Sequence, residues 1–395
     1  MFKKPNINSK NIRGFKAKLY PTDEQKKTFL IHMNLFRYIY NWGLEQSQKY
    51  YVENNEYIGK ARLQKLLSEY RNNTPWMQDL PLHSARLALD HLDFAYKRFF
   101  KNEARFPKFK SRKTCILKVH YRNEPYAFNL DSDSVRISGF GKNERIICKS
   151  HNIPKPIYSG YYNCTVTFDG IDFWLSVNTE IDPTYLECEE LSDESIGIDL
   201  GIRKFAQLSN GVIYQRPKIL KAIDKRLRKQ QSRLSKMRNR RYMTSKQTIT
   251  KFEDIPCTKN ELKLKDQNRK LRIRRKNITR SFLHQTTTEI ANMYPKRIVV
   301  EDLNVSEFIK NSKKINNKTE IYHSMWYKFR EYLAYKSMDR GIEFVVADHN
   351  FPSSQICSNC GSIKKSSYRI HICPVCGLRI DRDLNAAINL SNYYA

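Results

Sequence analysis

Two Cys-x-x-Cys pairs near the C-terminus constrain the local fold more tightly than any other feature of this sequence. Each pair is followed at once by a glycine, and the residues concerned are Cys357, Cys360, Gly361, Cys373, Cys376 and Gly377. A two-residue spacer lets two thiolates of one tight turn reach the same ion, and glycine permits the backbone conformation of that turn. The four cysteines are therefore predicted to hold a structural Zn²⁺ ion with tetrahedral geometry.

The remaining five cysteines stand far apart in the sequence, at Cys115, Cys148, Cys164, Cys188 and Cys257. A chain of 395 residues is long enough to bury its own hydrophobic cores, so it needs no disulfide framework. We therefore expect reduced thiols at these positions and a metal ion on the paired set.

Positive charge dominates the composition. Lys and Arg number 71 against 40 Asp and Glu, which gives a formal net charge of +31. Such an excess favours a polyanionic partner, and nucleic acid is preferred over a membrane surface. No apolar stretch is long enough to span a bilayer, and the opening MFKKPNINSKNIRGF lacks the apolar core of a signal peptide. We therefore expect a cytoplasmic protein that meets DNA or RNA there.

Two stretches concentrate the positive charge. In ARFPKFKSRKT (104–114), Phe alternates with Lys and Arg around Pro107, which suits a loop that contacts phosphates. Residues 216–280 are crowded with Lys and Arg, as in KRLRKQQSRLSKMRNRR, and their apolar residues recur at helical spacing. A solvated helix face is the alternative explanation, but charge of one sign would repel itself without a phosphate partner.

The first half of the chain combines one strand, several helices and a β-rich region. Residues 14–21 alternate like a strand, and helical patterns follow to about residue 50 and again over 60–72 and 84–102. From 115 to 183, short β-rich segments are separated by Asn, Asp, Gly and Pro. These segments predict an antiparallel β-barrel or sandwich, which the strand at 14–21 closes, so that the helices form an insertion.

The second half predicts an α/β domain with a mixed sheet. An acidic linker at 186–195 precedes it, and Asn210-Gly211 between two apolar runs indicates a hairpin. One long amphipathic helix then leads to a loop at 247–260, and helix is expected to resume around 277–293. Further strands are predicted at 296–304 and 342–347, with a helix between them that ends at Gly341 and a last short helix after the cysteines.

Three acidic residues stand in or beside apolar segments that are expected to be buried. They are Asp199 in IGIDLG, Glu301 after RIVV, and Asp383 at the start of a helix in DRDLNAAINL. Each has an ordinary explanation, namely a strand-end turn, a salt bridge and a helix cap. A buried carboxylate requires a cation or hydrogen bonds. Together they fit one site that holds two Mg²⁺ ions about 4 Å apart for attack on a phosphodiester.

Several longer motifs carry a family resemblance. They are KLYPTDEQ, RYIYNWGL and AYKRFFKNEARFPKFKSRK in the first half, and GIDLGIRKFAQLSNG, IVVEDLNVS and SSQICSNCG…CPVCG…DRDLNAAINL in the second. In these motifs the chain resembles the TnpB family, the RNA-guided DNA endonucleases of bacterial and archaeal insertion sequences, long labelled as transposases. The C-terminal motifs are more specific than the N-terminal ones. The loop at 247–260 is longer than is usual for this family. The family's RNA contacts are therefore not carried over to residues in this loop.

The resemblance implies roles for particular residues and partners. Asp199, Glu301 and Asp383 would be the catalytic carboxylates and Mg²⁺ ligands, with Asp383 preferred to Asp381 as the third. A guide RNA from the transposon end would pair with target double-stranded DNA beside a short adjacent motif, while the protein reads the motif and backbone shape. We expect a monomer bound to its RNA.

The resemblance also implies the fold class, multidomain α+β. It divides the chain into the first strand of a wedge β-barrel (1–21), a helical recognition domain (22–112), the rest of the barrel (113–190), a ribonuclease-H-like RuvC nuclease domain with basic helices at 216–293 (191–353), an inserted zinc ribbon (354–377) and the last nuclease segment (378–395).

Three other functions are compatible with some of these features. A compact type V CRISPR effector would have the same motifs, and neighbouring DNA would distinguish the two. An RNA-guided DNA-binding repressor without cleavage would have lost catalytic acids, whereas all three are present. A conventional DNA transposase would need a separate strand-transfer module, for which the sequence gives no sign.

Overall fold

A computed structural model gives the fold of the protein. It describes residues 12–111, 116–121, 128–141, 143–150, 153, 162–180, 189–202, 204–245, 256–303, 325–364 and 368–393. The chain forms two compact units, residues 1–185 and 186–395. Over the described residues, none of the helices has the length and apolar character needed to cross a membrane.

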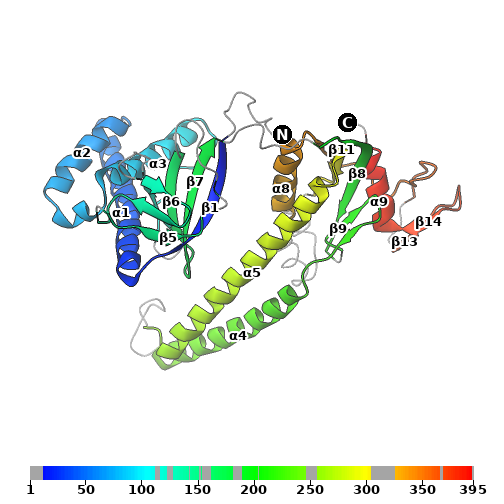
Figure 1. Ribbon diagram of the computed structural model, residues 1–395. Helices are drawn as coiled ribbons and strands as arrows, with labels where there is room; N and C mark the ends of the chain where they lie inside the picture. Colours follow the sequence, from blue (N-terminus) through cyan, green and yellow to red (C-terminus); the bar gives the residue numbers. More distant parts are fainter. Residues whose placement is uncertain are drawn as a thin grey trace. The chain divides into compact units, whose positions relative to one another are not determined.

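An antiparallel sheet of seven strands organises the first unit (Figure 1). Its order is β2-β6-β7-β1-β5-β4-β3, with β1 (Ile12–Tyr20), β2 (Leu117–Tyr121), β3 (Phe128–Leu130), β4 (Ser134–Ile137), β5 (Ile146–Cys148), β6 (Tyr162–Phe168) and β7 (Phe173–Glu180). The sheet is nearly closed and barrel-like. β1 pairs with β7 on one side and β5 on the other, so the predicted strand at 14–21 does complete this sheet.

Three helices and one 3-10 turn lie between β1 and β2, as the predicted insertion requires: α1 (Asp23–Asn54), α2 (Lys60–Asn72), η1 (Pro75–Asp79) and α3 (Leu82–Phe100). Thr22 begins α1 as its N-cap, because its Oγ1 accepts the N–H of Gln25 while Gln25 Oε1 accepts the N–H of Thr22. α1 and α3 pack on each other and on β2, and their apolar faces join the inner face of the sheet in one core.

The second unit contains the predicted mixed sheet, in the order β10-β9-β8-β11-β12. Its strands are β8 (Ser192–Leu200), β9 (Ala206–Leu208), β10 (Ile213–Tyr214), β11 (Pro295–Val300) and β12 (Glu343–Val346). β8, β9 and β10 are antiparallel, whereas β11 lies parallel to both β8 and β12. The turn between β9 and β10 holds Gly211 at φ 88°, as the Asn-Gly signal predicts. The predicted acidic linker at 186–195 is too long, because β8 begins at Ser192 and pairs with β11 from its first residue.

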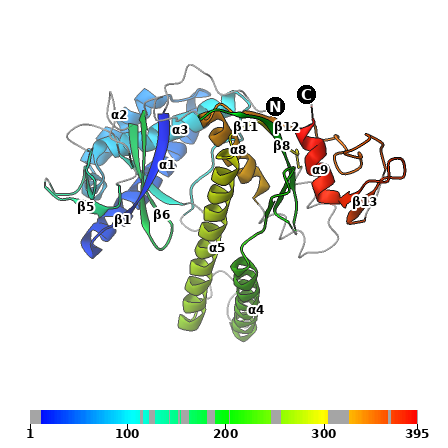
Figure 2. The ribbon, with the colours of Figure 1, turned by 45° about the vertical axis from the view of Figure 1, so that its right-hand side comes forward.

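Two long helices leave this sheet as a hairpin, α4 (Ile219–Ser245) and α5 (Lys259–Ala291), which run side by side in Figure 1 and Figure 2. The prediction that helix resumes near residue 277 is wrong, because α5 begins at Lys259. Thr258 caps it, with Oγ1 accepting the N–H of Glu261 at 3.2 Å. The buried side of the first half of α5 includes Leu264, Asn268 and Arg275. So few buried residues among so many charged ones could not be recognised from the sequence. Most of the predicted loop at 247–260 lies outside the described residues.

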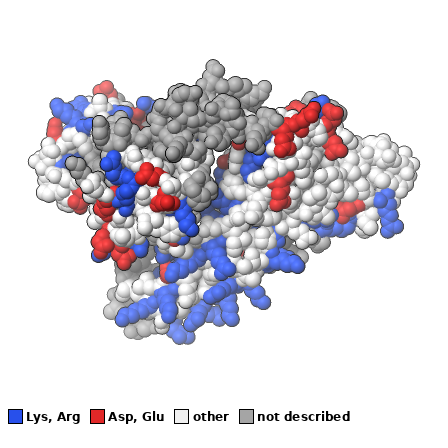
Figure 3. All heavy atoms as spheres, viewed as in Figure 1, with Lys and Arg blue, Asp and Glu red and all other residues white. Residues whose placement is uncertain are grey.

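The outer surface of this hairpin is strongly basic. Asp224 is the one acid of α4, and Glu261, Asp266 and Glu289 are those of α5. Two of these acids are used inside the hairpin, since Arg275 pairs with Asp224 and Arg241 with Glu261. Figure 3 shows Lys and Arg side chains gathered over α4 and α5.

The remaining elements of the second unit are α8 (Trp326–Asp339), β13 (Ile370–Ile372), β14 (Arg379–Asp381) and α9 (Arg382–Ser391). α8 packs on α5 and is followed by Gly341, whose φ of 72° ends the helix where predicted. α9 lies across β8, and β13 pairs with β14 in a small separate hairpin beside it.

Candidate active site

Asp199 and Glu301 lie together because two parallel strands are in register. Ile198 of β8 is paired with Val300 of β11, and each acid is the next residue along its strand. Paired residues of neighbouring strands point to the same side of a sheet, so the two residues that follow them share the other side. Both acids are partly buried. The sheet thus brings together two residues that are 102 positions apart (301 − 199).

Helix α9 brings Asp383 to the same face of the sheet, and Gly197 permits the approach. A Cβ atom on Gly197 would lie 2.0 Å from the carbonyl oxygen of Ala387 and 2.3 Å from the nitrogen of Ser391. Side chains at 197 and 199 point to the same side of β8. Since Gly197 faces the C-terminal half of α9, Asp199 faces its beginning, where Asp383 lies in the first turn.

The structure assigns different environments to Asp381 and Asp383. Asp381 is the N-cap of α9, with Oδ1 accepting the N–H groups of Asp383 (3.0 Å) and Leu384 (3.2 Å). The same oxygen accepts a hydrogen bond from Lys204 Nζ at 2.9 Å. These donors lower the pKa of Asp381 against the effect of its partial burial. Asp381 is therefore engaged in holding the helix start, and Asp383 is the acid that acts electrostatically on Asp199.

The three carboxylates create an environment that favours a cation. Burial, followed by the charges of Glu301 and Asp383, raises the pKa of Asp199 to about 8. Burial also raises the pKa of Glu301, with Asp302 adding to the effect and His349 opposing it. Hard carboxylate oxygens gathered in this way are the donors that Mg²⁺ prefers. The three acids thus have the chemistry that the predicted Mg²⁺ site requires, and their use as its ligands stays a prediction.

Three basic side chains surround Asp383, and the sequence did not identify them as part of the site. Arg369 Nη1 donates to Asp383 Oδ2 at 3.1 Å, and Lys204 Nζ lies 3.8 Å from the same oxygen. Arg382 lies 3.8 Å from Oδ1. No motif spacing relates Arg369 or Lys204 to Asp383, because they come from different elements and meet only in the folded chain.

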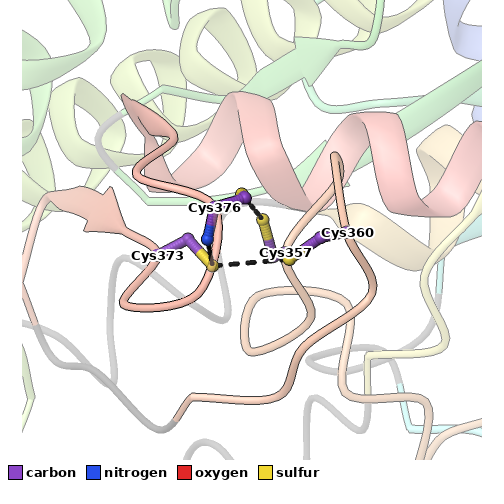
Figure 4. A group of neighbouring side chains, drawn as sticks. All are labelled: Cys357, Cys360, Cys373 and Cys376. Atoms are coloured by element: carbon purple, nitrogen blue, oxygen red, sulfur yellow. Dashed lines mark hydrogen bonds between the residues drawn. The ribbon is translucent and has the colours of Figure 1, made fainter.

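The four cysteines of the predicted metal site meet in one cluster (Figure 4). All four sulfur atoms lie within 4.8 Å of one another, with 3.6 Å between Cys357 and Cys376 and 3.5 Å between Cys360 and Cys373. A Zn–S bond of about 2.3 Å in a tetrahedral site places the sulfurs about 3.8 Å apart. The cluster is thus sized for one tetrahedral metal ion.

Both cysteine turns have the same backbone design. In each, the first cysteine accepts the N–H of the glycine four residues on, at 2.9 Å for Gly361 and 3.1 Å for Gly377. Each glycine has a φ near 75°, which explains its place in the motif. Ser362 Oγ lies 3.0 Å from Cys373 Sγ, and this contact, with the N–H of Cys376, lowers the pKa of Cys373 to about 5. A lowered pKa favours the thiolate that binds metals.

Two asparagines of α9 connect the cysteine turns to the helix that carries Asp383. Asn385 is fully buried; its Nδ2 donates to Ile356 O at 2.6 Å, and its Oδ1 accepts the N–H of Ser358 at 2.9 Å. Asn389 Nδ2 donates to the carbonyl oxygens of Ser353 and Ile356. The asparagines of the DRDLNAAINL motif therefore position the first cysteine turn. Of the other cysteines, Cys148, Cys164 and Cys257 are reduced, whereas Cys115 and Cys188 lie outside the described residues.

Comparison with protein families finds three matches along the chain. A family described as "Helix-turn-helix domain" matches residues 11–56, "Probable transposase" of the OrfB group of IS605 elements matches 176–312, and "Cas12f1-like, TNB domain" matches 326–390. The described part of this first range, residues 12–56, forms β1 and the single helix α1, so the first description does not apply to its fold here.

Similar proteins extend over almost the whole chain. "Putative RNA-guided DNA endonuclease InsQ" of Escherichia coli K12 is 26% identical over 96% of this chain and 92% of its own length. A protein of Streptomyces pristinaespiralis named "Putative RNA-guided DNA endonuclease" is also 26% identical, over 96% of this chain and 88% of its own. These family matches and full-length relatives agree with the resemblance to the TnpB family.

A solved structure agrees with the fold of this chain. A Cas12f1 chain, solved as the "Cas12f1-sgRNA-target DNA complex", superimposes with a TM-score of 0.56 at 15% identity. The match covers 94% of this chain and 83% of the Cas12f1 chain. At this identity the likeness establishes the fold and nothing further about this chain.

Proposed function

We propose that this protein is an RNA-guided, Mg²⁺-dependent endonuclease of an insertion sequence, which cuts double-stranded DNA beside a short adjacent motif. One observation carries the proposal: Asp199, Glu301 and Asp383 come from separate elements, and burial, followed by the charges of Glu301 and Asp383, raises the pKa of Asp199 to about 8. The match of residues 176–312 to a transposase family and the names of the full-length relatives support the same function.

The three carboxylates would hold two Mg²⁺ ions at the carboxyl ends of β8 and β11. When bound, such ions activate the attacking water and neutralise charge on the leaving oxygen. The charges of Glu301 and Asp383 both act on Asp199, and a bound cation would offset the repulsion among these carboxylates. Lys204 holds Asp381 at the start of α9 and so fixes the turn that presents Asp383. Gly197 sets the depth at which that turn meets the sheet.

The four cysteines would hold one Zn²⁺ ion and form the predicted ribbon. All four positions of a tetrahedral site are filled by protein sulfurs, which is typical of structural rather than catalytic zinc. Asn385 and Asn389 couple the ribbon to α9. In this interpretation the zinc supports the position of Asp383 and takes no part in hydrolysis.

Guide RNA and target DNA would use the basic surfaces. The α4–α5 hairpin carries an excess of Lys and Arg over acids, and the acids Asp224 and Glu261 are already paired within it. Counterion release from phosphates would make binding at this hairpin strongly dependent on salt. The wedge and recognition roles of residues 1–190 belong to the same proposal.

Sequencing of the RNA that copurifies with the protein tests the guide assignment. A discrete RNA that ends in variable sequence is expected, and a target plasmid that matches this sequence should then be cut when Mg²⁺ is added. A random population of RNA fragments would contradict the guide assignment, because a basic surface alone binds RNA without selection.

Asp199→Ala tests the active site itself. Cleavage should be lost while the copurified RNA and its pairing with target DNA are retained, because Asp199 lies on the sheet and away from the basic hairpin. Asp193→Ala, on the exposed beginning of the same strand, is the matched control and should cut like the parent. Mg²⁺-dependent cutting by the Asp199→Ala protein would refute the assignment.

A further inference from the structure

A cavity in the first unit gathers positive charge that the proposed active site does not use. Its volume is about 340 Å³, at the small end of the range for ligand pockets. Its walls come from α1, from the loop that follows α3 and from the paired strands β2 and β6, and include Met33, Phe36, Arg37, Lys110, Lys118 and Thr167. Lys118 and Thr167 are direct cross-strand partners.

Lys110 is fixed at the edge of the cavity by α1. Arg37 Nη1 and Asn41 Nδ2 both donate to its carbonyl oxygen, at 3.1 Å and 3.0 Å. Its N–H donates to Asn41 Oδ1 at 2.8 Å, and its ammonium lies 3.2 Å from the centre of the Tyr40 ring. The phosphate-contacting loop expected at 104–114 is therefore anchored at this residue, and its charge is held in place before any ligand binds.

The cavity combines cations with an apolar wall. Among the described residues, its lining includes Arg37, Lys110 and Lys118 and contains no carboxylate. Lys118 remains accessible to solvent, yet partial burial lowers its pKa. The neighbouring histidines add no charge near neutral pH. Burial first, then the charges of Lys118 and Lys110, lowers the pKa of His91 to about 4, and burial, then His91 and the same two lysines, lowers that of His120 to about 3. The His120 ring packs against Phe36, with ring centres 5.3 Å apart and the ring planes tilted by 40°.

We propose that this cavity binds one unpaired nucleotide of the bound RNA. The base would lie against Ile116 and Leu117, beside which Met33 and Phe36 are buried, and the adjoining phosphates would meet Arg37, Lys110 and Lys118. RNA loops and bulges present unpaired bases, which proteins recognise by stacking and apolar contact. A base of duplex DNA would first have to leave its stack, at a cost of a few kcal/mol. Thr167 supplies a hydroxyl that can distinguish a ribose by its 2′-OH. This inference rests on the proposed function only in requiring bound RNA.

Ultraviolet crosslinking of the full-length protein with its copurified RNA tests the proposal. Mass spectrometry should find a nucleotide adduct on the peptide that contains Phe36 or on the one that contains Leu117. Lys118→Gln should lower the yield of this adduct about fivefold, the effect expected for a charged contact, while Lys118→Arg retains most of it. Lys27→Gln removes the same charge from an exposed position of α1 and is the matched control.

A second variant keeps the test independent of charge. Ile116 lines the cavity and is 64% exposed, so Ile116→Trp adds bulk at the opening without disturbing the core. This variant should lose the adduct and keep all three cations. Total copurified RNA should change little in any variant, because the α4–α5 hairpin remains intact.

The outcomes separate the two proposals. If RNA crosslinks to α4–α5 peptides but never to this cavity, the cavity assignment is wrong and the guide function stands. If the cavity crosslinks to target DNA and not to RNA, the choice of RNA is overturned. If no RNA copurifies or crosslinks anywhere, the proposed function itself has failed.

Discussion

The second unit contains two clusters of metal-type ligands that are built in opposite ways. The cysteine cluster uses two copies of one turn, and each turn brings its own glycine and its own hydrogen bonds. The carboxylate cluster has no turn of its own, since Asp199, Glu301 and Asp383 come from β8, the end of β11 and the start of α9. The first depends on local geometry, and the second depends on the whole sheet.

This difference affects how each cluster tolerates change. Local turns make the cysteine positions independent of the rest of the unit, whereas the acids depend on strand register and on the close contact of α9 with Gly197. The two clusters are nevertheless connected, because Asn385 and Asn389 hold the first cysteine turn on the helix that carries Asp383. Substitutions in the cysteine cluster should therefore disturb the positions of the carboxylates less than substitutions in the sheet or in α9 do.

The largest expected effect separates the two acids at the start of α9. Asp383→Asn should lower target cleavage at least a hundredfold, since it removes a charge at the reacting centre. Asp381→Asn keeps a side-chain oxygen as N-cap but loses the charge paired with Lys204, so its activity should fall less than about tenfold. Initial cleavage rates at saturating Mg²⁺ measure both. Equal losses would mean that Asp381 shares the metal site.

Replacement of a cysteine should have a smaller effect on cleavage than replacement of an acid. Cys373→Ser should remove zinc from the purified protein, as measured by elemental analysis, because three thiolates bind the ion more weakly than four. Cleavage should fall by about ten- to a hundredfold, the range for residues that support a site from outside. Cys257→Ser, which removes a reduced thiol elsewhere in the unit, should keep both zinc and activity. A loss as large as that of Asp383→Asn would contradict indirect coupling.

The cysteine turns could be predicted from the sequence because their information is local. The pair spacing, the following glycines and the resulting sulfur cluster agree with the prediction. The strand–hairpin–helix order was also readable, since Asn210-Gly211, Pro295 and Gly341 mark its turns. These signals are confined to a few neighbouring residues, so no tertiary contact was needed to interpret them.

The electrostatics of the carboxylate site could not be predicted in the same way. No sequence motif relates Lys204 or Arg369 to Asp383. Lys204 and Asp381 are 177 residues apart in the sequence, and they come into contact only because α9 packs on β8. Gly197 looks like an ordinary strand residue until the Ala387 carbonyl is placed against it. The start of α5 was missed for a related reason, because its buried face becomes visible only against α4.

The charge on Asp199 should make the stability of the second unit depend on pH when no divalent cation is present. Its pKa is about 8 in the folded protein, against an ordinary value near 4, so the folded state retains a proton that the unfolded state loses. The contribution of this group to stability therefore falls as pH rises from about 4 to about 8.

Asp199→Asn should remove this dependence and stabilise the Mg²⁺-free protein at pH 8, by about 1–3 kcal/mol relative to the parent. Urea denaturation at pH 5 and pH 8 in Mg²⁺-free buffer measures the effect, with Asp193→Asn as control. If the stability of the parent protein and that of Asp199→Asn changed by the same amount between pH 5 and pH 8, Asp199 would ionise normally.

The smallest expected effect concerns Arg369, the contact by which the cysteine region reaches the carboxylates. Arg369 donates to Asp383 Oδ2 and is 45% exposed at its side chain, so the pair should be worth less than about 1 kcal/mol. Because a metal ion would compete for the same carboxylate, Arg369→Gln should tighten Mn²⁺ binding about two- to fivefold, as measured by electron paramagnetic resonance. Arg379→Gln removes an exposed charge from β14 and should leave Mn²⁺ affinity unchanged. Weaker Mn²⁺ binding by the Arg369 variant would show that Arg369 orders the site instead of competing for it, and the two clusters would then be more tightly coupled than their construction indicates.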